Sequence, residues 1–242
     1  MKSAYTSRNL EYYDGGCETE QYLKRHYHRV RCEIASNIID RALTESKSKE
    51  VRLLDIGCSS GYSTELVFGA YVKRMTCVGL DISVSALKLA NHRGILCAAG
   101  DIEDSLPFAS NCFDVIFAGE VIEHIIEIDS FLFEVRRCLK ARGLLVLTTP
   151  NLARLIDRIR FLVGLPPKQT IPMHRYLKYH VTPFTYASLK TSLRRCGYQV
   201  ESFASNFVYF DPTCRREFKS RLAARLAPSL GGTLIVGARR AK

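Results

Sequence analysis

The stretch Val51-Arg-Leu-Leu-Asp55-Ile-Gly57-Cys-Ser-Ser-Gly61 decides the fold of this chain. It is an apolar run of strand length that ends in an acidic residue and continues into a loop of glycine and small polar residues. The residues that follow, 62–70, are typical of the start of a helix. Strand, small-residue loop and helix form the nucleotide-binding unit of α/β folds. Gly57 and Gly61 permit positive φ angles and a close approach of backbone to ligand.

The spacing within this loop distinguishes two classes of ligand. A dinucleotide site requires the pattern G-x-G-x-x-G, whereas this loop has Gly57-x-x-x-Gly61 preceded by Asp55. The run Asp55-Ile-Gly-Cys-Ser-Ser-Gly61 resembles motif I of the class I S-adenosylmethionine-dependent methyltransferases, with Ser59 at the middle small position. The resemblance implies that these residues bind the cofactor: Asp55, Gly57, Cys58, Ser59 and Gly61.

Two further turns carry acidic residues where the adenosine of such a cofactor would lie. The apolar run 75–80 is a second expected strand, and Asp81 follows the loop by about 20 residues, the distance at which an acidic residue accepts ribose hydroxyls. The resemblance implies that Ile82 packs on the adenine. It also implies that Asp101 contacts the exocyclic amine and that the backbone of Ile102 contacts a ring nitrogen.

Acidic residues lie at the carboxyl ends of four strands of the expected sheet, namely Asp55, Asp81, Asp101 and Glu120. The carboxyl ends of parallel strands share the edge at which α/β sheets bind ligands. A ligand with a sulfonium and an ammonium group suits this set of carboxylates better than a pyrophosphate does. The sequence therefore predicts S-adenosylmethionine as the cofactor and S-adenosylhomocysteine as its product, rather than NAD(P).

The succession of apolar runs and amphipathic segments predicts an α/β, Rossmann-like fold with helices on both faces of the sheet. The resemblance extends over residues 51 to about 151 and implies seven strands in the order 3-2-1-4-5-7-6, with strand seven antiparallel. We expect residues 1–50 to form an N-terminal helical lid in which Tyr13 caps the cofactor; a surface tyrosine without this role is the alternative. Residues 51–242 are the expected methyltransferase domain, with an acceptor-site insertion at 152–183.

The expected reaction, methyl transfer from a sulfonium, is an in-line displacement in which alignment and exclusion of water are central. A general base is needed only for an acceptor that must lose a proton. His124, just after the fourth strand, is the expected catalytic base, and His174 and His180 are the next candidates. A purely structural role for His124 is the alternative.

The spacing Glu120-x-x-Glu123-His124, with the distant His180, is also compatible with a divalent metal, and similar spacing occurs in small-RNA 2′-O-methyltransferases. Because the spacing is widespread in metal-free small-molecule enzymes, we expect no metal.

Three functions stay open. The sequence favours a methyltransferase acting on an O, N or C nucleophile of a small-molecule or lipid- or glycan-type metabolite. The others are an RNA methyltransferase with metal-assisted 2′-O chemistry and a non-catalytic cofactor-binding subunit.

Charge is unevenly distributed along the chain, whose net charge is +11. Residues 152–242 hold 17 Lys and Arg against 4 Asp and Glu, whereas residues 1–151 hold 18 against 20. The asymmetry favours an anionic or lipid-linked acceptor. The basic amphipathic run 152–163 is compatible with peripheral contact to an anionic membrane, and packing on the domain is the alternative. Because no RNA-binding module is recognisable, nucleic acid is not the expected substrate.

The cysteines and the lengths of the apolar runs indicate the cellular compartment in which the protein is expected. Nine cysteines are scattered without a C-x-x-C pair, which indicates small core residues in a reducing compartment rather than a disulfide framework. No apolar run reaches the ~18 residues that span a bilayer. We expect a cytoplasmic protein, with membrane association left open. The methyl acceptor, the oligomeric state and any partner protein also stay open.

Overall fold

The structure is a computed structural model that describes residues 24–45, 50–170, 180–210 and 218–241. Its main sheet has seven strands: β1 (Arg52–Ile56), β2 (Thr76–Asp81), β3 (Leu96–Ala99), β4 (Phe113–Gly119), β5 (Leu139–Pro150), β6 (Tyr198–Ala204) and β9 (Thr233–Arg240). Their order is β3-β2-β1-β4-β5-β9-β6, and β9 runs antiparallel to both of its neighbours. The predicted Rossmann-like topology, with the last strand of the chain inserted antiparallel, is confirmed.

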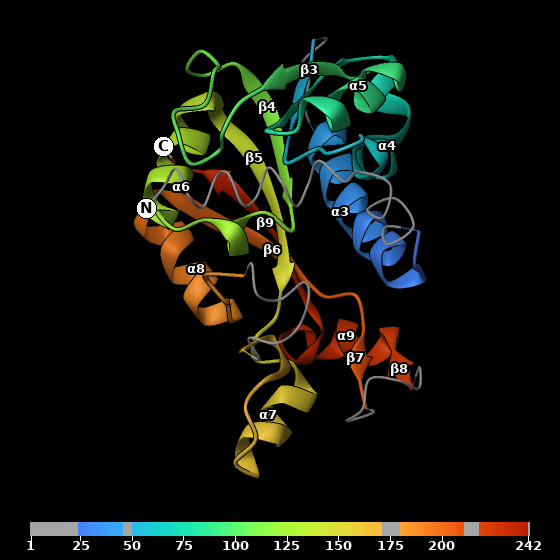
Figure 1. Cartoon of the computed structure of the whole chain (residues 1–242), viewed down its shortest axis with the longest axis vertical. Coiled ribbons are helices and arrows are strands. Elements are labelled where there is room, and N and C mark those ends of the chain that lie inside the picture. Colours follow the sequence, from blue (N-terminus) through green and yellow to red (C-terminus); the bar gives the residue numbers. More distant parts are fainter. Residues whose placement is uncertain (1–23, 46–49, 171–179, 211–217, 242) are drawn as a thin grey trace.

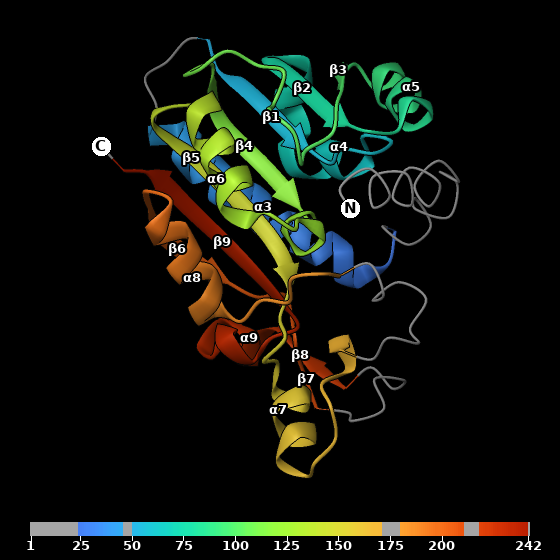
Figure 2. The same cartoon turned by 60° about the vertical axis from the view of Figure 1, so that its left-hand side comes forward.

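Helices cover both faces of this sheet (Figures 1 and 2). One layer comprises α3 (His26–Glu45), α4 (Tyr62–Phe68) and α5 (Val84–His92), and the other comprises α6 (Ile128–Cys138) and α8 (Tyr186–Arg195). Successive side chains of a strand point to opposite faces. Leu53 of β1 accordingly joins the core cluster of Ile39 from α3, whereas Leu54 joins that of Leu132 from α6.

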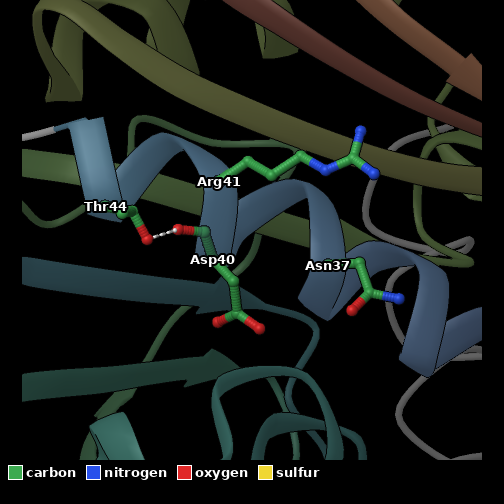
Figure 3. A pocket seen from close by; sticks show the side chains of 4 residues that line it. All are labelled: Asn37, Asp40, Arg41 and Thr44. Atoms are coloured by element: carbon green, nitrogen blue, oxygen red, sulfur yellow. Dashed lines mark hydrogen bonds between the residues drawn. The ribbon is translucent and has the colours of Figure 1, made fainter.

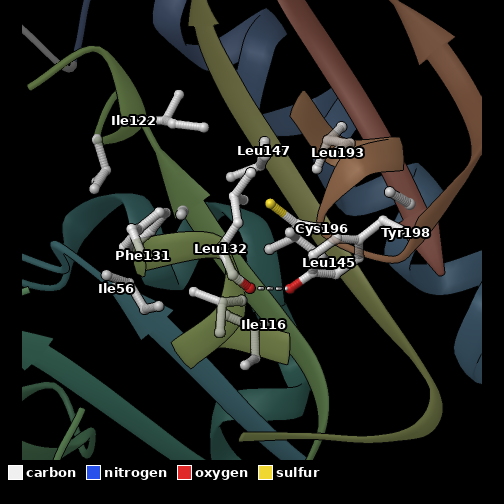
Figure 4. Packing of buried hydrophobic residues seen from close by; sticks show 14 of the residues in the cluster. Ile56, Ile116, Ile122, Phe131, Leu132, Leu145, Leu147, Leu193, Cys196 and Tyr198 are labelled. Carbon is white, nitrogen blue, oxygen red and sulfur yellow. Dashed lines mark hydrogen bonds between the residues drawn. The ribbon is translucent and has the colours of Figure 1, made fainter. Parts of the chain in front are cut away.

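The cluster under α6 and α8 fixes the half of the sheet from β4 to β6 (Figure 4). Leu132 from α6 and Leu193 from α8 are fully buried with Leu145 and Leu147 of β5. The buried phenol of Tyr198 donates a hydrogen bond to the carbonyl of Leu132 at 3.0 Å, so its polar atom is satisfied. This packing holds the carboxyl ends of β4 and β5 in place.

The junction between α6 and β5 differs from the sequence-based expectation. The cations and glycine of residues 139–143 are typical of a helix stop, and the apolar run from Leu144 predicts that the fifth strand begins there. The helix ends at Cys138, as such a stop requires, but Leu139 is already extended and pairs with Phe113 of β4. Leu139 is fully buried, so its burial in the sheet outweighs the local stop signal.

Several short elements complete the chain. They are α7 (Leu155–Leu162), β7 (Val208–Tyr209), β8 (Lys219–Ser220), α9 (Arg221–Leu226) and the 3-10 turns η1 (Gly69–Lys73), η2 (Ile122–His124), η3 (Lys168–Thr170) and η5 (Pro228–Leu230). α7, α9, β7 and β8 lie at the end of the molecule opposite β3 (Figure 1). Within the described residues, every helix is too short or too polar to cross a membrane. The proposed lid and insertion boundaries stay predictions.

Candidate functional site

The loop between β1 and α4 has three residues with positive φ angles: Gly57 at 72°, Ser59 at 49° and Gly61 at 77°. A Cβ at Gly57 would lie 2.6 Å from Val121 Cγ2, and one at Gly61 would lie 2.6 Å from Ile95 Cδ1. Both positions therefore require glycine for conformation and for space. Ser59, at the middle small position of the loop, adopts the left-handed conformation although it is not a glycine.

Asp81, at the end of β2, holds this loop in place through a hydrogen bond from the main chain of Ser59. Its Oδ2 accepts a hydrogen bond from Ser59 N at 2.8 Å, and its Oδ1 accepts one from Ser83 N at 2.9 Å. Burial raises the pKa of Asp81, and the hydrogen bonds from Ser83 and Ser59 oppose the rise. Each carboxylate oxygen has a second lone pair, so Asp81 keeps acceptor capacity toward a ligand that rests on the loop.

Asp55 and Cys58 support the loop from inside the protein, because each is only 1% exposed. Asp55 Oδ2 accepts a hydrogen bond from Thr64 Oγ1 of α4 at 2.5 Å. Burial raises the pKa of Asp55 to about 7, the bond from Thr64 opposes the rise, and the charge of Asp81 adds to it. The thiol of Cys58 fits against Gly79 of β2, so any contact of Cys58 with a cofactor comes from its main chain.

The residues expected around the adenine follow β2 and β3 at the same edge of the sheet. Ile82 is half-buried between β2 and α5. Asp101 begins the turn after β3, where its Oδ1 accepts a hydrogen bond from Glu103 N at 3.0 Å. Ile102 is half-buried and packs against the core cluster of α6. The structure thus brings the expected adenosine residues and the glycine-rich loop to one edge.

Glu120, just after β4, forms a buried interaction that the sequence analysis missed. Its Oε1 lies 2.9 Å from Nη1 of Arg31 and accepts a hydrogen bond from Thr148 Oγ1 at 3.1 Å. Arg31 comes from α3 and is 1% exposed. The sequence does contain a signal for this pair, because Arg31 shares a helical stripe with the buried Ala35 and Ile39. A cation on an apolar stripe indicates a buried anionic partner.

These contacts change the charge that was expected at the strand ends. The sequence predicts four carboxylates at this edge. In the structure, the charge of Glu120 is compensated by Arg31, and burial raises the pKa of Asp55 to about 7. The negative charge of the edge is therefore smaller than four units.

Three potential ligand or base residues lie close together beyond the end of β4. Glu123 and His124 lie in η2, and His180 lies in the segment before α8. The rings of His124 and His180 are 4.9 Å apart between centroids, at 86°. Tyr13 and His174, also expected near the site, lie outside the described residues.

A hollow on α3 does not belong to this site. It is lined by Asn37, Asp40, Arg41 and Thr44, and Thr44 Oγ1 donates a hydrogen bond to the carbonyl of Asp40 at 2.7 Å (Figure 3). None of the expected site residues lines it.

Comparison with known proteins bears directly on this geometry. Residues 54–147 match a family model described as a methyltransferase domain. The fold and this match agree on a methyltransferase domain over residues 54–147. The match runs from β1 to β5 and includes the glycine-rich loop, Asp81 and Glu120. The cofactor of such a domain is S-adenosylmethionine, whose sulfonium supplies an activated methyl group.

Relatives of this methyltransferase domain include enzymes with different acceptors. The mitochondrial ubiquinone biosynthesis O-methyltransferase of Mus musculus is 27% identical over 190 residues, which cover 71% of this chain and 48% of that protein. The malonyl-[acyl-carrier protein] O-methyltransferase of Legionella pneumophila is 30% identical over 126 residues, which cover 50% and 43%. The chain spans about half the length of these curated relatives.

A solved structure supports the fold of the domain. The CurJ carbon methyltransferase superposes with a TM-score of 0.64 at 21% sequence identity, over 93% of this chain and 58% of that chain. The residues at the edge fit the cofactor: glycine at positions 57 and 61 leaves the loop without side chains there, and the Asp81 oxygens retain lone pairs for hydroxyls.

Proposed function

We propose that this chain transfers the methyl group of S-adenosylmethionine to an O, N or C nucleophile of a small-molecule acceptor. The observation that carries the proposal is the carboxylate of Asp81. Its Oδ2 holds the glycine-rich loop through Ser59 N, its Oδ1 holds the start of α5 through Ser83 N, and both oxygens retain acceptor capacity. A ligand with ribose hydroxyls and an amino-acid end fits beside such a loop at the carboxyl edge of the sheet. The methyltransferase relatives support the same reaction class.

Incubation with methyl-labelled S-adenosylmethionine and fractionated metabolites, lipids and RNA tests this function. Label in a metabolite or lipid fraction is the expected result. Label confined to RNA would instead favour an RNA methyltransferase. The affinity of the chain for RNA should then fall steeply with salt. Binding of S-adenosylhomocysteine without transfer to any fraction would favour a non-catalytic subunit.

We further propose that the end of the molecule formed by α7 and α9 contacts an anionic lipid surface. Phe161 and Leu162 of α7 are 72% and 85% exposed, and Leu226 of α9 is 80% exposed. Both helices lie at the same end (Figure 1). The net charge of residues 152–242 is strongly positive. Exposed apolar side chains within a basic half of the chain are the combination that binds anionic membrane surfaces.

Replacing Phe161 and Leu162 by serine should weaken binding to vesicles that contain phosphatidylglycerol by more than tenfold. Burying one large apolar side chain is worth about 1.5–3 kcal/mol, so the loss of two exceeds a factor of ten. Vesicle sedimentation measures the affinity. The matched control is Leu96→Ser on β3, because Leu96 is also exposed (57%) but lies at the opposite end of the molecule. Equal affinities of both variants would contradict the proposed contact.

A further inference from the structure

Glu123, His124 and His180 form a compact cluster of ligand-type side chains. One potential ligand atom from each residue lies within 4.8 Å of the other two. Two of the residues come from η2, and the third comes from a segment 56 positions later in the sequence. Long-range convergence of two imidazoles and one carboxylate is a donor set suited to a divalent transition metal.

Main-chain hydrogen bonds fix the relative position of the two segments. The N–H groups of Val181 and Thr182 both donate to the carbonyl of Glu123, at 2.9 and 3.1 Å. Thr182 Oγ1 also donates to the carbonyl of Ile125 at 3.0 Å. The segment that carries His180 is therefore tied directly to the turn that carries Glu123 and His124. Such a tie holds the cluster in place before any ligand arrives.

Glu123 provides a second, independent observation. It is 2% exposed, and its Oε2 accepts a hydrogen bond from Thr149 Oγ1 at 3.0 Å. Its Oε1 is buried and has no hydrogen-bond partner within residues 24–45, 50–170, 180–210 and 218–241. A buried polar atom without a hydrogen-bond partner destabilises the folded state by about 1–3 kcal/mol. A bound ligand at Oε1 would remove this cost. Thr149 orients the carboxylate in the way that outer partners orient metal ligands.

We propose that Glu123, His124 and His180 bind a divalent transition-metal ion that holds an oxygen of the methyl acceptor. Glu120 is not part of this ligand set, because its carboxylate is not among the ligand groups that lie within 4.8 Å of one another, and its Oε1 pairs with Arg31. Three protein ligands leave coordination positions open for a hydroxyl oxygen. His124 acts here as a ligand rather than as a general base.

The part of this inference that concerns the acceptor rests on the proposed methyl transfer. The metal lowers the pKa of a bound hydroxyl, and the released proton passes to solvent. The acceptor oxygen then forms a bond to the methyl carbon while the bond between that carbon and sulfur breaks, and the electron pair of that bond stays on sulfur. The products are a methyl ether and S-adenosylhomocysteine. The acceptor class is thus a hydroxyl compound.

Calorimetric titration of the purified chain with Mn²⁺ and with Zn²⁺ tests the site. We expect one ion per chain, and we expect His180→Ala and Glu123→Gln each to weaken its affinity more than tenfold. His92→Ala is the matched control, because His92 lies on α5 and hydrogen-bonds Lys88 O, away from the cluster. Affinity for S-adenosylhomocysteine, measured on each variant, reports that the fold is retained.

Two results would overturn the inference. The first is that neither ion binds to the unmodified chain. The second is that His180→Ala and Glu123→Gln, with S-adenosylhomocysteine affinity retained, bind metal as tightly as His92→Ala does. If only the proposed function is wrong, the cluster still binds metal but no methyl transfer is detected. This outcome differs from both results above. Methyl transfer that survives a chelator and both site variants would overturn the assigned role of the metal in holding the acceptor.

Discussion

Arg31→Met is expected to lower the free energy of unfolding by about 3–5 kcal/mol, the cost of removing one partner from a buried ion pair. Arg31 is almost completely buried, and its guanidinium lies 2.9 Å from Glu120 Oε1 and 3.2 Å from Thr148 Oγ1. The methionine fills a similar volume but leaves the carboxylate of Glu120 without its counter-charge. Urea denaturation at neutral pH measures the loss.

Arg221→Met is the matched control for this experiment. Arg221 of α9 also pairs with a glutamate, since its Nη2 lies 2.9 Å from Oε1 of Glu33 on α3, but both side chains are exposed. An exposed pair contributes about 0–1 kcal/mol, so the control should remain close to the unmodified protein. Losses of similar size in the two variants would show that the pair of Arg31 and Glu120 does not stabilise the domain.

Asp81→Ala is expected to weaken the binding of S-adenosylhomocysteine by more than tenfold. Hydrogen bonds to a charged acceptor contribute about 1.5–3 kcal/mol, and the substitution also releases Ser59 N of the glycine-rich loop. Calorimetry measures the affinity. Asp104→Ala, in the exposed turn after β3, removes a charge without touching the loop and should have little effect.

A cofactor analogue separates the two roles of Asp81. If its carboxylate accepts the ribose hydroxyls, a 2′,3′-dideoxy analogue should lose affinity for the unmodified chain and lose little further affinity for Asp81→Ala, because coupled contacts are not additive. Additive losses would mean that Asp81 acts only through the loop. An unchanged affinity of Asp81→Ala for the natural product would remove the ribose assignment altogether.

Features set by local sequence were predictable. The central strands β1 and β4 are mainly apolar runs because both of their faces are buried, and the run before Asp55 is one of them. Serine before an amphipathic run is typical of a helix N-cap, and Ser83 caps α5, since its Oγ accepts a hydrogen bond from Ala86 N. The loop spacing was also informative, because Gly57 and Gly61 occupy positions where a side chain would clash.

Features set by tertiary contacts were not predictable. The pairing of Arg31 with Glu120 joins residues that only the folded sheet brings together. The early start of β5 at Leu139 depends on its pairing with Phe113, which no local pattern encodes. The apolar face of α7 is only partly buried, since Ile156 is 2% exposed whereas Ile159 is 47% exposed. The sequence allowed His180 to join Glu123 and His124, but the main-chain bonds that bring the two segments together are seen only in the fold.

The central claim is that the carboxyl edge of β1, β2 and β4 binds a positively charged methyl donor. Calorimetric titration of the unmodified chain with S-adenosylmethionine, S-adenosylhomocysteine, NADH and ATP tests it most directly. The account predicts that the first two ligands bind, one per chain, and that the other two bind at least a hundredfold more weakly. Tight binding of NADH or ATP, with no detectable binding of S-adenosylmethionine or S-adenosylhomocysteine, would contradict it.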